Sequence, residues 1–178
     1  MTQLLDLTAY RSKAIERRAF ASWEKRFGES YGVETRLADL TDKTLYFLAK
    51  PGEQTALAHY ELIMGILDMG KGPKFYYLDG EDQLMVSDVQ LFLIDQVRFE
   101  LMRRLGWLAS FPGQDYPLFE MVQAFETIKG EVGQKPVALS RSHPEYDAYN
   151  KLINADKQVF MRRKIVAALK KFGATFTE

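Results

Sequence analysis

The stretch from residue 81 to residue 107 constrains the fold more than any other part of the chain. If this stretch forms a helix with 100° per residue, its apolar side chains spread around most of the helix circumference. Such a distribution is typical of a helix inside a larger fold or a membrane. Charged residues interrupt every run long enough to span a bilayer: Asp88, Asp95, Arg98, Glu100, Arg103 and Arg104. The stretch therefore predicts a central buried helix enclosed by other helices.

Periodic apolar residues elsewhere predict further helices. We expect one that is capped by Asp6 or Thr8 and ends near Phe27, one over 41–50 that is capped by Thr41, and two that carry Pro51 and Pro117 in their first turns. Asp79 is the expected cap of the central helix. Residues 142–145 match a capping box that opens a helix to about residue 153, and Asn154 or Asp156 caps a last helix that reaches Phe172. The fold class expected is all-α, a bundle of about six or seven helices in one domain over 1–178.

Two short runs leave room for some β-structure. Residues 44–49 and 74–78 are rich in strand-favouring side chains, and they could pair as a small two-stranded sheet. A short helix over 44–49 and an extended segment over 74–78 is the simpler interpretation.

Composition excludes several classes of protein. The chain of 178 residues holds no cysteine, so disulfides, thiolate metal sites and a cysteine nucleophile are absent. Its 24 basic and 24 acidic residues cancel, which leaves no overall field to draw it onto nucleic acid or an acidic membrane. No secretory signal, transmembrane run or lipidation motif is recognisable, so we expect a cytoplasmic protein without membrane contact.

Two carboxylates stand out on the predicted central helix. Asp88 and Asp95 are seven residues apart and therefore point to nearly the same side, among apolar neighbours. Each would cost several kcal/mol if it were buried without a partner. Asp95 has Arg98 three residues later as a partner, whereas Asp88 has none within its own helix. They form either a structural tie or an exposed strip, or else a pocket that binds a cation or supplies an acid and a base.

His59 and Tyr60 on the preceding helix could complete that pocket. The candidate ligand-binding set is Asp88, Asp95, Arg98, His59 and Tyr60. His59 lies close to an apolar face, where a hydrogen-bonded core histidine is the alternative interpretation. The sequence contains no histidine–glutamate metal motif, no serine elbow and no glycine-rich phosphate loop. We therefore expect no metal and no cofactor, and we identify no catalytic residue.

The last helix is basic on one side. Arg163, Lys164, Lys170 and Lys171 gather away from its apolar residues. Such a face could follow phosphates, but charged helix faces are usually solvated, and the zero net charge disfavours nucleic acid as a partner.

The function these features favour is protein association. Chemical motifs are missing, and aromatic residues are concentrated near the ends of predicted elements, where they often line interfaces. We expect a homo-oligomer or an adaptor. The alternative is a small-molecule-binding or catalytic helical protein that uses the carboxylate-lined pocket.

Overall fold

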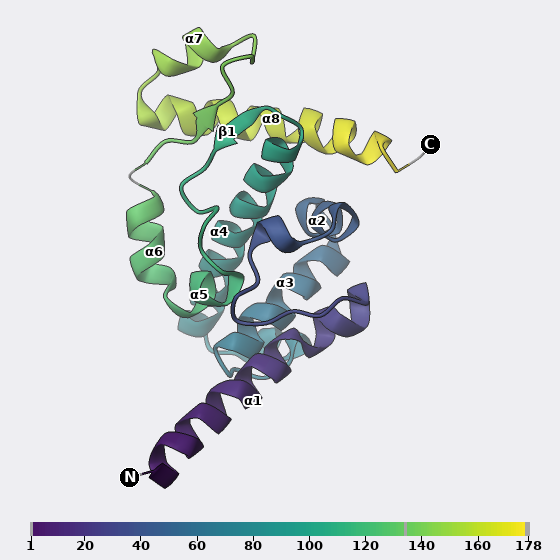
Figure 1. The fold of residues 1–178 in the computed structure, drawn as a ribbon, viewed down its shortest axis with the longest axis vertical. Coiled ribbons are helices and arrows are strands. Elements are labelled where there is room, and N and C mark those ends of the chain that lie inside the picture. The colour runs from purple at the N-terminus through teal and green to yellow at the C-terminus, as the bar shows by residue number, and fades with distance from the viewer. Residues whose placement is uncertain (1, 134, 177–178) are drawn as a thin grey trace. The chain divides into compact units, whose positions relative to one another are not determined.

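The computed structural model describes residues 2–133 and 135–176. The regular secondary structure of this part of the chain is helical apart from one short two-stranded sheet (Figure 1). The all-α fold class is confirmed. The α-helices are α1 (Thr2–Phe27), α2 (Asp42–Ala49), α3 (Glu53–Ile66), α4 (Gly80–Arg104), α5 (Leu118–Gln123), α6 (Phe125–Val132), α7 (Tyr146–Asn150) and α8 (Asn154–Ala174). Two 3₁₀ helices, η1 (Leu37–Asp39) and η2 (Gly72–Tyr77), and strands β1 (Leu108–Ser110) and β2 (Ala138–Leu139) complete the list.

The chain divides into two compact units, and each unit is built from three separate segments. The first unit comprises residues 1–35, 51–93 and 117–125. The second comprises residues 36–50, 94–116 and 126–178. Helix α4 is continuous across the boundary at residue 93, so one helix contributes to both units.

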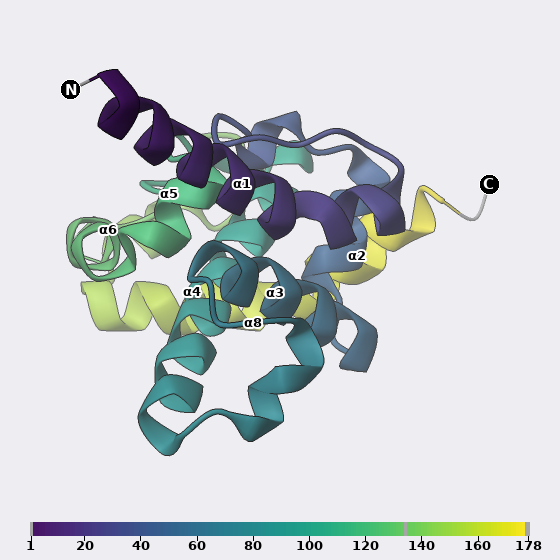
Figure 2. The ribbon, with the colours of Figure 1, turned by 90° about the horizontal axis from the view of Figure 1, so that it is seen from below.

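In the first unit, α1 lies along α3 (Figure 2). Ala19 and Gly65 let the two backbones approach closely, since a Cβ on Gly65 would come within 2.8 Å of the Ala19 Cα. Buried Trp23 fixes the register, because its indole Nε1 donates a hydrogen bond of 2.8 Å to the carbonyl oxygen of Ala58. Ala19 and Trp23 thus lie on the face of α1 that contacts α3.

The expected starts of α1 and α3 are wrong, and the expected end of α1 is confirmed. Helix α1 begins at Thr2, upstream of the predicted caps, so Asp6 and Thr8 lie inside it. Gly28 follows α1 with a φ of 72°, the left-handed conformation in which glycine ends helices. Helix α3 begins after Gly52, so Pro51 precedes the helix rather than occupying its first turn.

The small β pairing exists, but the segments differ from those considered in the sequence. Residues 44–49 belong to α2, whose N-cap Thr41 accepts a hydrogen bond at Oγ1 from the backbone N–H of Thr44. Residues 74–77 are part of η2. The sheet is formed by β1 and β2 instead, which run antiparallel with Leu108 opposite Leu139. The backbone propensity of the aromatic runs was outweighed by helix capping and packing.

Helix α4 forms as predicted, with a cap at Asp79, whose carboxylate accepts from the N–H of Asp82 at 2.9 Å. It ends earlier than expected, at Arg104, and the left-handed Gly106 separates it from Trp107. Its second half is well buried along Val97, Leu101 and Met102.

The expectation that α4 is enclosed on every side is wrong for its first half. Val86, Val89 and Leu93 are buried there, but Leu84 is 67% exposed and Leu91 is 60% exposed. The helix wheel predicted apolar residues on opposite sides, and the chain covers only one of those sides. An apolar face left in water is therefore the main departure from the predicted core.

The remaining helices differ from the sequence expectation in their boundaries. The helix expected after Pro117 is divided into α5 and α6 at Ala124, whose φ and ψ of −109° and 35° interrupt it. The capping box at 142–145 does not form, because the Nδ1 of His143 accepts the N–H of Glu145 and holds these residues in a turn. Helix α7 consequently begins only at Tyr146. The cap predicted at Asn154 or Asp156 is wrong, because Ile153 occupies the N-cap position of α8 and makes no side-chain cap. Pro117 likewise occupies the N-cap position of α5 rather than its first turn.

No helix within residues 2–133 and 135–176 combines the length and the apolar character needed to cross a lipid bilayer.

Candidate functional site

The exposed apolar face of α4 carries a regular pattern. Leu84, Asp88 and Leu91 follow one another at intervals of four and three residues, which places them on one side of the helix. All three side chains are exposed, and Asp88 lies between the two leucines. We call these three residues the α4 stripe.

Two exposed tyrosines precede this helix on η2. Tyr76 is 75% exposed and Tyr77 is 89% exposed. The segment that carries them is anchored, because the side-chain amide of Gln83 donates a 3.1 Å hydrogen bond to the carbonyl oxygen of Phe75. The ring of Phe75 also stacks on Tyr60, with centroids 4.4 Å apart and planes 6° apart. The first unit therefore holds aromatic surface in a defined position just before the α4 stripe.

Helix α8 carries a second pattern in the second unit. Val159, Arg163, Val166 and Lys170 follow one another at intervals of four, three and four residues, and all four are exposed. Val159 is 46% exposed and Val166 is 75% exposed, whereas the buried side of the helix contains Met161, Ala168 and Phe172. We call the four exposed residues the α8 stripe. The basic side predicted for the last helix therefore alternates cations with valines.

The structure distributes the predicted pocket residues between the two units. His59, Tyr60 and Asp88 belong to the first, and Asp95 and Arg98 to the second. His59 is buried at 2% exposure, Tyr60 stacks on the ring of Phe75, and Asp88 is exposed. Of the five residues, Asp95 and Arg98 are the pair that the structure brings together electrostatically, within one unit.

The environment of Asp95 is partly desolvated. Burial raises the pKa of its carboxyl group, and the guanidinium groups of Arg162 and Arg98 oppose that rise. Burial lowers the pKa of Arg98, which Asp95 partly offsets, and the Nε of Arg98 donates a 3.0 Å hydrogen bond to the carbonyl oxygen of Ala49. Arg98 thus joins α4 to the end of α2. The carboxylate of Asp95 is half-buried and lies beside two cations.

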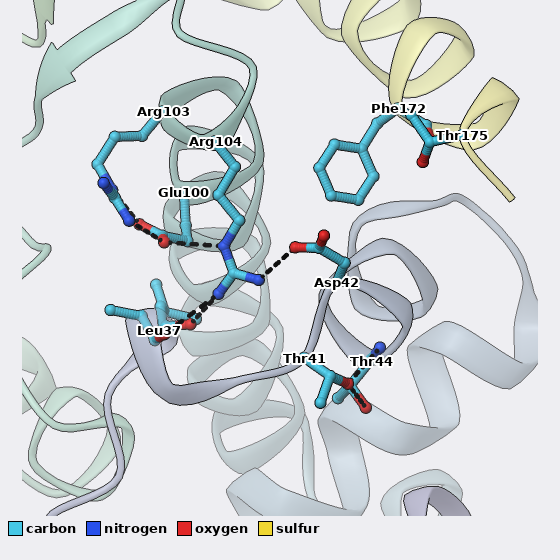
Figure 3. A network of polar contacts seen from close by, with 10 residues as sticks. Leu37, Thr41, Asp42, Thr44, Glu100, Arg103, Arg104, Phe172 and Thr175 are labelled. Atoms are coloured by element: carbon cyan, nitrogen blue, oxygen red, sulfur yellow. Dashed lines mark hydrogen bonds and ion pairs between the residues drawn. The ribbon is translucent and has the colours of Figure 1, made fainter.

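A polar network that sequence reasoning missed lies one helical turn further along α4 (Figure 3). Glu100 is 1% exposed, and it accepts hydrogen bonds from Arg103 at 2.7 and 2.8 Å and from Arg104 at 3.1 Å. Arg104 also donates to the carboxylate of Asp42 at 2.8 Å and to the carbonyl oxygen of Leu37 at 2.9 Å. The spacing of Glu100 from the two arginines, at i+3 and i+4, was the signal that could have found it.

This network ties the segment around η1 and the start of α2 to α4. The oxygens of Glu100 are occupied by two guanidinium groups, so the buried carboxylate is compensated and does not act as a free base. Its role is structural. In the part of the chain that the structure describes, no group of three or more histidine, cysteine, aspartate or glutamate residues is arranged to hold a metal ion.

Comparisons of the chain with protein-family models, with curated proteins and with solved structures found no match in any of the three.

Proposed function

We propose that this chain is a protein-association module and that it associates with further copies of itself. The observation that supports the proposal is the exposed apolar surface on η2 and the first half of α4, formed by Tyr76, Tyr77, Leu84 and Leu91. Holding these side chains in water gives the folded chain no hydrophobic stabilisation. Large apolar side chains exposed in this way are typical of protein contact sites.

The size of this surface sets the expected strength of the contact. Two helical turns and two tyrosines fall below the roughly 800 Å² per partner of a standard stable interface. We therefore expect reversible self-association in the micromolar range rather than a permanent oligomer. The zero net charge gives no long-range repulsion between copies.

Sedimentation velocity over concentrations from about 1 to 300 µM tests the proposal across the range where micromolar affinities are visible. We expect the average mass to rise with concentration. The double substitution Leu84→Ser and Leu91→Ser should suppress that rise, because it removes the apolar part of the α4 stripe. Tyr10→Ser is the matched control, since Tyr10 is an equally exposed apolar residue (72%) on α1. A wild-type chain that stays monomeric throughout contradicts the proposal.

A second candidate function is the binding of a small charged ligand beside Asp95 and Arg98. It is supported by the half-buried carboxylate next to two cations, an arrangement whose desolvated charges could recognise a polar molecule. Thermal-shift screening of small anions and cations tests it. A ligand that stabilises the wild-type chain should lose that effect in Asp95→Asn, while the melting temperature of this variant without ligand is no lower than that of the wild type. A ligand shift that Asp95→Asn leaves intact contradicts this candidate.

A further inference from the structure

The α4 stripe and the α8 stripe have the same spacing and opposite charge. Leu84, Asp88 and Leu91 repeat at intervals of four and three residues, and Val159, Arg163 and Val166 repeat at the same intervals. Each stripe therefore presents one charged side chain between two apolar ones on two turns of exposed helix. The central charge is acidic on α4 and basic on α8.

Resting on the proposed self-association, we propose that the α4 stripe of one copy docks against the α8 stripe of a second copy, with Asp88 facing Arg163. The two leucines then pack against the two valines, as in the seam between paired helices with apolar residues seven positions apart. Because both charges lie in the middle of their stripes, parallel and antiparallel docking place Asp88 opposite Arg163 equally. Lys170, the last residue of the α8 stripe, adds a second cation one helical turn after Val166.

Both central charges are available for this contact. Asp88 and Arg163 are exposed, and within the described residues neither side chain makes a hydrogen bond or an ion pair. Arg162, by contrast, lies beside Asp95 of its own unit and belongs to that cluster. The ion pair between copies would thus form without breaking a contact inside either one.

Charge also favours this unlike pairing over a symmetric one. A contact between two α4 stripes would place Asp88 beside Asp88, and a contact between two α8 stripes would place Arg163 beside Arg163. Like charges at the centre of an interface are strongly disfavoured. Unlike stripes form a head-to-tail contact, which leaves each copy with one stripe unused unless a ring closes.

Val159 and Val166 distinguish a protein partner from a nucleic acid on the α8 stripe. A helix that follows phosphates presents cations and polar groups at its exposed positions. Here two of the four exposed residues of the α8 stripe are valines, and apolar side chains contribute nothing to phosphate contact.

A charge-swap series tests the docking. We expect Asp88→Arg and Arg163→Glu each to weaken the self-association measured by sedimentation at least about tenfold, because each places like charges opposite one another. The chain that carries both substitutions should recover wild-type association, since the ion pair is restored with its direction reversed. Glu120→Arg and Lys151→Glu are matched controls: they make the same charge changes at exposed positions outside both stripes, and they should have no effect.

Blocked variants test the head-to-tail geometry. The chain with Leu84→Glu and Leu91→Glu has a blocked α4 stripe, and the chain with Val159→Glu and Val166→Glu has a blocked α8 stripe. Each should be monomeric alone, and an equimolar mixture should form a 1:1 complex and nothing larger, because one intact stripe of each kind remains. Circular dichroism confirms that these exposed substitutions leave the helices folded.

The outcomes separate the docking from the proposed function. A wild-type chain that is monomeric at all concentrations overturns both. A wild-type chain that associates while Arg163→Glu behaves like the controls overturns the docking alone. The docking is also overturned if the α8-blocked chain associates normally, if the blocked mixture stays monomeric, or if the double charge swap fails to restore association.

Discussion

At the scale of single residues, the buried charges of α4 are distinguished by how completely they are paired. Glu100 has two guanidinium partners and is fully compensated, whereas Asp95 keeps a desolvated carboxyl group that two neighbouring arginines only partly stabilise. The paired carboxylate of Glu100 favours the folded state. The desolvated carboxyl group of Asp95 costs free energy in the folded state when it is ionised.

We predict that Arg104→Met lowers the free energy of unfolding by about 2–3 kcal/mol, because it removes a partner of a buried carboxylate and one of the two donors to the carbonyl oxygen of Leu37. Urea denaturation followed by circular dichroism measures this change. Asp42→Asn is the comparison, since its carboxylate is 63% exposed and the loss should not exceed about 1 kcal/mol. Equal losses in the two variants would show that the buried part of the network does not stabilise the fold.

Asp95→Asn should stabilise the protein at neutral pH. The folded-state pKa of Asp95 is raised, so between the ordinary aspartate pKa of about 4 and that raised value the folded state binds more protons than the unfolded state. The contribution of Asp95 to the free energy of unfolding therefore falls as the pH rises from the ordinary pKa to the raised one. It is recovered as the pH falls through the same range.

The advantage of Asp95→Asn, measured by urea denaturation, should accordingly be larger at pH 7 than near pH 4. Asp115→Asn, on an exposed loop of the same unit, should change stability little at either pH. An Asp95→Asn advantage that does not change with pH would contradict the desolvation of this carboxyl group.

At the scale of elements, the contact between α1 and α3 depends on the absence of a side chain at Gly65. A Cβ there would meet the backbone of Ala19 at 2.8 Å, and backbone atoms cannot rotate away as a flexible side chain can. The two helices would have to separate to admit even a methyl group.

We therefore predict that Gly65→Ala lowers the free energy of unfolding by about 1–3 kcal/mol, the usual cost of overpacking. Gly130→Ala is the same substitution in α6, where the added Cβ meets no atom within 4 Å. It should instead stabilise the protein by about 0.5–1 kcal/mol through helix propensity. Thermal denaturation of both variants measures the contrast, and a Gly65→Ala chain as stable as wild type would contradict the close approach of α1 and α3.

Element positions could be predicted from the sequence better than element surroundings. The period of apolar residues gave α1, α3, α4 and α8, and Thr41 and Asp79 gave correct helix starts, because capping is a local property. The wheel of α4 could not reveal that Leu84 and Leu91 face water, since an interface leucine and a core leucine have the same spacing. The five predicted pocket residues belong to two different units, and periodicity does not encode the packing that decides contact between distant segments.

Local signals also failed where a side chain had a competing partner. The Ser142–Glu145 pattern is a good capping box, but the imidazole of His143 takes the N–H of Glu145 and turns the chain. The break between α5 and α6 at Ala124 has no sequence signal that we recognise, since neither glycine nor proline occupies that position.

At the scale of the whole molecule, α4 links the stability of the two compact units. Its buried residues Val89 and Leu93 belong to the first unit, and Val97 and Leu101 belong to the second. Helix formation is cooperative, so loss of either half removes support from the other.

We predict that the two units unfold in one transition. Trp23 lies in the first unit and Trp107 in the second, so the single-tryptophan chains Trp107→Phe and Trp23→Phe report on one unit each. In each chain, the urea midpoint from tryptophan fluorescence should coincide with the midpoint from circular dichroism, as expected for a two-state process. Separate midpoints within one variant would mean that the units unfold independently.

The division of each unit into three segments also bears on how the chain can mature during synthesis. The first unit draws on residues as late as 125, and the second takes its last segment from residue 126 onward. A nascent chain emerging from the ribosome would therefore display the apolar sides of its early helices before their later partners exist, which is when aggregation competes with folding. We therefore expect the translating chain to be prone to aggregation until the segments beyond its midpoint have been synthesised.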